Sequence, residues 1–229
     1  MMKTREMNGL LVLTLFLLMH GCGPSLIQMD KNELSRLENL SNIHAVHYPS
    51  SSFNVRTPGK TLAGGGGALG SIISLGLFES AGEKMTKDYA LEDPILNVQN
   101  HFLSSLETDL GLTNIRIVQE SPSEDSIDEL KRTVGNGMVI DFKTTQWMLY
   151  YYPTDWSHYR IAYSARGRLV RLEDSQIIWQ GTCESVGQDP KTSPTMNELI
   201  ANNGALLKEV ISEAANACAE QLSTHFLAK

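Results

Sequence analysis

The clearest pattern in the chain is a series of three long stretches in its second half that the sequence predicts to be strands. They cover Met138 to Tyr151, His158 to Leu172 and Gln176 to Val186. The gaps that separate them, around Pro153 and around Asp174, are short enough for antiparallel hairpins. Because the first two stretches exceed the usual strand length of about 5–6 residues, we expect bends or bulges in them.

Two helices are predicted from apolar residues that recur at helical spacing. The first runs from Asp93 to Gly111, with Asp93 as the N-cap and Gly111 as the stop signal. The second runs from Met196 to Phe226 and begins with a capping box formed by Thr195 and Glu198. Its pattern is interrupted at Asn202-Asn203-Gly204, where we expect a kink.

Shorter elements complete the predicted fold. They are a helix over Asp30 to Leu40, a strand over Ile43 to Tyr48, a helix from about Ala68, a strand over Asn114 to Gln119, and an acidic helix over Ser123 to Thr133 that begins with a capping box of Ser126 and Glu129. This order predicts one α+β domain over residues 30–229. We expect a largely antiparallel sheet with helices packed on at least one face and a long C-terminal helix.

The N-terminus carries a different pattern, an uncharged apolar run from Leu10 to Met19 that follows Lys3 and Arg5. The run is too short to cross a membrane as a helix, which takes about 20 residues. A basic start followed by such a run is typical of a cleaved export signal, which we assign to residues 1–21. The alternative is a buried core helix.

The end of this run, Leu18-Met19-His20-Gly21-Cys22, resembles the lipobox of bacterial lipoproteins. The resemblance implies that the signal is cut before Cys22 and that acyl chains on the Cys22 thiol anchor the protein to a membrane, with residues 22–29 as a lipidated tether. Leu18 lies one position earlier than the usual Leu of the lipobox. Because Gly23 and not Asp follows Cys22, the family analogy further implies the outer membrane, with the domain in the periplasm.

The element order, the anchor and the C-terminal helix together resemble the periplasmic domain of curli-secretion-type lipoproteins and related uncharacterised outer-membrane lipoproteins. No diagnostic motif in the domain supports this resemblance. It implies a non-enzymatic component of the cell envelope that acts through a protein partner or through self-association.

The net charge and the cysteine content further limit the functional classes to which the protein could belong. The formal net charge of −7 argues against sequence-independent binding of nucleic acid, which depends on basic residues that contact phosphates. If Cys22 is lipidated, Cys183 and Cys218 remain as an even pair in an oxidising compartment, and we predict a disulfide between them. The alternative is a pair of buried free thiols.

The stretch from Leu62 to Phe78 has no charge and six glycines. We predict that it is an interaction segment for membrane or for neighbouring copies, because its small residues recur at a spacing that lets helices approach closely. The residues involved are Gly64, Gly66, Ala68, Gly70, Ile72, Ile73 and Leu75. The alternative is that the half from Ala68 onward packs on the sheet while the glycine run is a loop.

Sites for chemistry are harder to find. Pro58-Gly59-Lys60-Thr61 ends like a phosphate-binding loop but lacks its first glycine, because Asn54 stands at that position. His44 and His47 point to opposite faces of a strand, which disfavours a joint metal site. The sequence therefore predicts no catalytic residues, no metal and no cofactor.

Two clusters remain without an assigned role. Arg160, Arg166 and Arg168 share one face of a predicted strand, where they would meet lipid phosphate, an acidic partner or charged residues on neighbouring strands. An aromatic cluster surrounds the first hairpin and consists of Trp147, Tyr150, Tyr151, Tyr152 and Trp156. Packing in the sheet core and at the hairpin explains most of this cluster, and a membrane-interface or peptide-binding role is the alternative.

The sequence thus favours a lipid-anchored, non-enzymatic envelope component. The alternative is a periplasmic binding module for a small apolar or lipid ligand, which would use the aromatic hairpin and the glycine-rich loop. An enzyme of unrecognised type ranks below both.

Overall fold

The computed structural model describes residues 26–37, 40, 42–59 and 68–228. Their secondary structure is mixed, with one sheet and several helices, and the predicted fold class is confirmed. The helices are α2 (Lys31–Leu37), α4 (Ala68–Tyr89), α5 (Ile95–Leu110), α6 (Ile127–Val134) and α7 (Met196–Leu227). The strands are β1 (Ile43–His47), β2 (Asn54–Arg56), β3 (Ile115–Ile117), β4 (Met138–Tyr152), β5 (Asp155–Arg171) and β6 (Gln176–Val186).

The three long strands form the predicted antiparallel meander. The sheet order is β3-β1-β4-β5-β6, and β2 pairs with the far end of β4. The predicted irregularities are present in both strands, since β4 has an extra residue between Thr144 and Gln146, and β5 has extra residues opposite the step from Tyr151 to Tyr152. The short strands differ from the rest, because β1 pairs in parallel with both β3 and β4, and β2 pairs in parallel with β4.

The strand β2 was missed by the sequence analysis. It has three residues, and of these only Val55 is buried, so it carries too little alternation for a pattern to detect. Its partner helix α4 approaches it very closely. A Cβ atom on Gly82 would lie 1.5 Å from the carbonyl oxygen of Phe53, so this contact admits only glycine.

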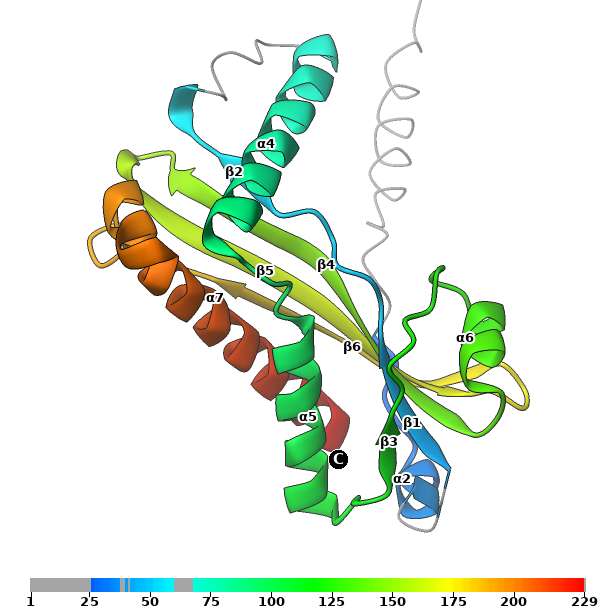
Figure 1. The fold of residues 1–229 in the computed structure, drawn as a ribbon. Coiled ribbons are helices and arrows are strands. Elements are labelled where there is room, and N and C mark those ends of the chain that lie inside the picture. Colours follow the sequence, from blue (N-terminus) through cyan, green and yellow to red (C-terminus); the bar gives the residue numbers. More distant parts are fainter. Residues whose placement is uncertain (1–25, 38–39, 41, 60–67, 229) are drawn as a thin grey trace, which may run out of the picture.

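Helices cover both faces of the sheet, as Figure 1 shows, with α5 and α7 side by side on one face and α6 on the other. The larger core lies under α5 and α7. Its centre is an aromatic cluster in which the Phe102 ring lies 5.7 Å from Trp179 and 5.4 Å from Phe226, centroid to centroid. The Trp179 indole lies over Gly167 and Gly181, where an added Cβ would come within 3.0 and 2.6 Å of the ring.

The long C-terminal helix is kinked at the predicted place. Its φ/ψ values are non-helical from Ala201 to Gly204, and φ is positive at Asn202, Asn203 and Gly204. The Thr195–Glu198 capping box is also present in both halves. The Ser126–Glu129 box is only half formed, because the Glu129 carboxylate accepts from the backbone and hydroxyl of Ser123 instead of from the Ser126 backbone.

Two contacts attach other parts of the chain to the outer edge of β6. The amide groups of Gln221 on α7 donate to the carbonyl of Glu184 at 2.9 Å and accept from its N–H at 3.1 Å. Ile27 exchanges two backbone hydrogen bonds of 3.0 Å with Gln180. The edge strand is therefore closed at two positions, which reduces its ability to pair with another strand.

The structure also joins Cys183 on β6 to Cys218 on α7 in a disulfide, with Cα atoms 5.1 Å apart. Both cysteines are buried. In the chain-entropy model, a loop of 35 residues contributes roughly 4 kcal/mol to the free energy of unfolding. The bond fixes the middle of α7 against the sheet beside the Gln221 contact.

We predict that Cys183→Ala lowers the free energy of unfolding by roughly 3–4 kcal/mol, because it releases the 35-residue loop in the unfolded state. Urea denaturation of the variant and of the parent protein measures this change, and reduction of the parent should reproduce it. Alkylation of the folded protein without reductant should label neither Cys183 nor Cys218. Labelling of both thiols would show that the bond is absent.

Candidate functional site

The predicted site residues are distributed unevenly over the described chain. Cys22, Gly64 and Gly66 lie outside the described residues. Ala68, Gly70, Ile72, Ile73 and Leu75 lie on the N-terminal half of α4. That half extends beyond the end of the sheet in Figure 1.

The C-terminal half of α4 packs against the sheet instead. Phe78 is buried, with the Arg56 guanidinium 5.2 Å from its ring centroid, and Gly82 touches the β2 backbone.

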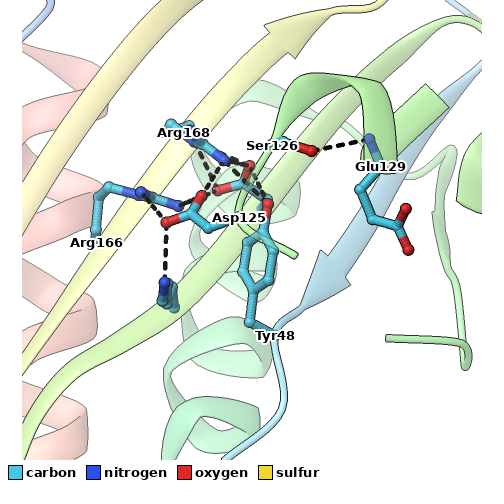
Figure 2. A network of polar contacts seen from close by, with 8 residues as sticks. Tyr48, Asp125, Ser126, Glu129, Arg166 and Arg168 are labelled. Carbon is cyan, nitrogen blue, oxygen red and sulfur yellow. Dashed lines mark hydrogen bonds and ion pairs between the residues drawn. The ribbon is translucent and has the colours of Figure 1, made fainter. Parts of the chain in front are cut away.

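The arginines that the sequence placed on one face have separate partners. Arg160 stacks on Tyr150 and Tyr152, with its guanidinium carbon 4.4 and 4.5 Å from the two ring centroids. Arg166 and Arg168 join a buried ionic cluster, formed by Tyr48, Asp125, Asp141, Lys143, Arg166 and Arg168. Figure 2 shows the cluster between the sheet and the loop that precedes α6.

The centre of the ionic cluster is Asp141, which is 0% exposed. Arg168 donates to both of its carboxylate oxygens, at 2.7 to 3.1 Å. Arg168 also donates to the Tyr48 hydroxyl at 3.0 Å and to Asp125 at 2.9 Å. Every charge at this centre has a partner of opposite sign, as a buried ion pair requires.

Asp125 connects this centre to α6, because it directly precedes the N-cap residue Ser126. Arg166 donates to both of its oxygens at 2.9 Å, and Lys143 donates at 3.0 Å. Partial burial alone would raise the pKa of Asp125, but the hydrogen bonds from Arg166 and Lys143 outweigh it and hold the pKa well below its usual range. Asp125 is therefore a permanently charged anchor for the α6 loop.

Burial acts on the other members of the cluster. Burial raises the pKa of Asp141, while the charges of Arg168 and Arg166 lower it and so oppose part of that shift. Burial and the nearby Asp141 charge also raise the pKa of Tyr48. The bidentate contact with Arg168 keeps Asp141 ionised at neutral pH, in our interpretation. The network holds α6 on the sheet, and it offers no free carboxylic acid, because Asp125 and Asp141 are both paired with arginines.

The aromatic hairpin is divided by the structure. Trp156 is 56% exposed and packs edge-on against Tyr151, with centroids 6.3 Å apart. Trp147, which the sequence analysis grouped with it, is only 3% exposed and lies 4.7 Å from Phe53. Trp147 belongs to the core beneath β2, as packing in the sheet core predicts for this residue.

A groove next to Trp147 is a concave feature that the sequence analysis missed. It has a volume of about 780 Å³ and lies between the loop from β1 to β2, the C-terminal half of α4 and the turn into α5. The buried carboxylate of Asp93 lies in its lining, where it accepts hydrogen bonds from the Ser51 and Ile95 N–H groups and from Thr144 Oγ1. The lining residues come mostly from loops, which carry no periodic pattern.

In the described part of the chain, no group of three or more His, Cys, Asp or Glu residues is placed so that it could hold a metal ion. His44 is buried on β1, and its Nε2 lies 3.0 Å from the side-chain oxygen of Asn42. His47 lies at the groove.

We predict that Asp141→Asn lowers the free energy of unfolding by about 3–5 kcal/mol, because it leaves the buried Arg168 guanidinium without its main counter-charge. Asp174→Asn is the matched control. Asp174 pairs with Arg171 at an exposed site, where losing a pair costs less than about 1 kcal/mol. Urea titrations of both variants give the comparison. Equal losses would mean that the ionic cluster does not fix α6 to the sheet.

Comparisons with known proteins give distant likenesses only. No protein-family model matches the chain, and no curated protein matches its sequence. Among solved structures, the PelC dodecamer from Paraburkholderia phytofirmans is 14% identical, with a TM-score of 0.33 over 80% of this chain and 86% of that chain. The hypothetical protein CT253 from Chlamydia trachomatis is 7% identical, with a TM-score of 0.38 over 82% and 99%. Lipoprotein GNA1162 from Neisseria meningitidis is 14% identical, with a TM-score of 0.29 over 76% and 97%. At these values the similarities do not assign this chain to a family or to an activity.

Proposed function

We propose that this chain is a lipid-anchored lipoprotein of the bacterial outer membrane, with a periplasmic domain that acts as a non-enzymatic assembly or interaction component. The observation that carries the proposal is the sequence from Leu10 to Cys22, an uncharged apolar run that ends in a lipobox-like Gly-Cys. Residues 1–21 are the export signal in this proposal, and residues 22–29 connect the acylated Cys22 to the domain. The finer likeness to curli-secretion-type lipoproteins rests on the element order, the N-terminal anchor and the C-terminal helix, and on no diagnostic motif.

The attachment of Ile27 to β6 supports a defined orientation on the membrane. Cys22 precedes Ile27 by five residues, which span at most roughly 17 Å of extended chain. Since Ile27 is hydrogen-bonded to Gln180, acyl chains on Cys22 would hold the β6 edge close to the lipid surface. Strand β3, at the other edge, is four strand spacings away, or about 19 Å.

This orientation leaves the side of the sheet away from β6 for partners. The N-terminal half of α4, which carries the proposed interaction residues from Ala68 to Leu75, extends past the end of the sheet at which β2 pairs with β4 (Figure 1). We propose it as the surface for a protein partner or for a second copy. None of the helices in the described ranges is long and apolar enough to cross a bilayer.

We expect Cys22→Ala to abolish membrane attachment, because it removes the thiol that carries the acyl chains. Metabolic labelling with a fatty-acid analogue should mark the parent protein and leave the variant unmarked. In cell fractionation, the variant should appear as an uncut precursor or in the soluble fraction, and not as mature protein in the membrane fraction. Mature protein that stays with the outer membrane after this change would exclude Cys22 as the anchor.

The orientation has a separate test. A photo-crosslinking amino acid at Thr182, on the β6 edge two residues from Gln180, should capture lipid in native membranes. The same group at Ile117, which is 44% exposed on β3, should capture little. Equal lipid capture at the two positions would contradict the orientation while leaving the lipid anchor itself intact.

A further inference from the structure

The groove between α4, the β1–β2 loop and the α4–α5 turn has the size of a small-molecule site. Its volume of about 780 Å³ falls in the range of roughly 300–1,000 Å³ that such sites occupy. The structure gives it an apolar floor and an open mouth. Phe53, Leu91, Ile95 and Trp147 are each at most 6% exposed and form the floor, while Leu96 is 43% exposed at the rim.

Polar atoms without partners gather in this lining. Within the described ranges, Trp147 Nε1, Ser51 Oγ and His47 Nδ1 are buried and make no hydrogen bond, and all three residues line the groove. Leaving a buried donor unpaired costs about 1–3 kcal/mol, so three such atoms in one place are unusual for a surface that only packs. An indole N–H can only donate, so Trp147 requires an acceptor.

The charged residues around the groove limit which kind of ligand acceptor could bind to Trp147 Nε1. Glu83 and Glu92 are exposed at the rim with Lys87, and the Asp93 carboxylate lies beneath them. Asp93 already accepts three hydrogen bonds from the protein, which use most of the acceptor sites of its carboxylate. A ligand with a negative charge would meet an excess of carboxylates here, which favours a neutral acceptor.

We propose that this groove binds a small uncharged amphiphile, whose apolar body packs on Phe53, Leu91 and Leu96 and whose carbonyl oxygen accepts a hydrogen bond from Trp147 Nε1. Trp147 is the one residue that the groove lining shares with the aromatic cluster described from the sequence, and the lining does not include Trp156 at the hairpin. The site does not depend on the lipid anchor, and it adds a binding activity to the proposed interaction component.

The test uses the full chain with Cys22→Ala, so that no acyl chain competes for the groove. The probe is 6-propionyl-2-dimethylaminonaphthalene, a neutral fluorophore with an apolar body and a ketone. Two analogues test the chemistry: 2-dimethylaminonaphthalene lacks the ketone, and 6-dimethylamino-2-naphthoate carries a carboxylate in its place. We expect saturable binding of the ketone, at least roughly fivefold weaker binding of both analogues, and a shift of the Trp147 indole N–H resonance by the ketone alone.

Variants locate the binding. Trp147→Phe keeps an aromatic ring and removes the donor, and should weaken binding of the ketone by roughly fivefold without changing the affinity for the analogue that lacks it. Since Trp147 is buried, Leu96→Asp at the exposed rim provides a second variant whose folding is not at risk. Its matched control is Ile117→Asp, on a residue of nearly the same exposure, 43% against 44%, outside the groove lining.

We expect Leu96→Asp to reduce binding of the ketone by tenfold or more and Ile117→Asp to leave it unchanged. Equal binding of the three compounds, an unmoved Trp147 resonance, or equal effects of the two aspartate variants would each overturn the proposal. Loss of membrane attachment in Cys22→Ala has no bearing on this result, so the two proposals stand or fall separately.

Discussion

The packing of Trp179 against the sheet is the contact on which the rest of the structure depends. Its indole packs closely against two strands because Gly167 on β5 and Gly181 on β6 have no side chains in its way. Phe102 from α5 and Phe226 from α7 then meet the same ring, with Phe226 4.9 Å from it, centroid to centroid. One indole therefore brings both helices onto one face of the sheet, and the disulfide and Gln221 hold α7 in place there.

The opposite face is organised by charge and not by apolar packing alone. A small core of Val46, Leu130, Val139 and Val170 lies under α6, and the ionic cluster closes its side. Burying Asp141 and Arg168 costs solvation free energy that their mutual contacts only partly return. The cluster fixes the position of the loop before α6, because Asp125 finds matching donors only where Arg166, Arg168 and Lys143 converge. The acidic helix is thereby held at one place on the sheet.

The sequence predicted the parts of this fold that repeat and missed those that do not. The strands β4, β5 and β6, the helices α5 and α7, and the kink at Gly204 all follow from periodicity or from residues with a strong local preference. The parallel pairing of β1 and β3 and the existence of β2 depend on long-range contacts of short segments, which leave no local pattern. Arg166 and Arg168 were recognised as a group, but their partner Asp125 lies 41 residues from Arg166 in the sequence.

The groove could not be predicted for the same reason, and its position gives it meaning within the whole molecule. Its lining combines the β1–β2 loop, α4 and Trp147 of β4, and β4 is separated from β6 by β5. Contacts along β6 close that edge: the Ile27 bridge leads toward Cys22, and Gln221 and the disulfide bind α7. The chain thus concentrates its attachments at one edge of the sheet. The unpaired Trp147 donor, the open groove and the projecting half of α4 lie toward the other edge, so a molecule anchored through Cys22 would present these features away from the lipid surface.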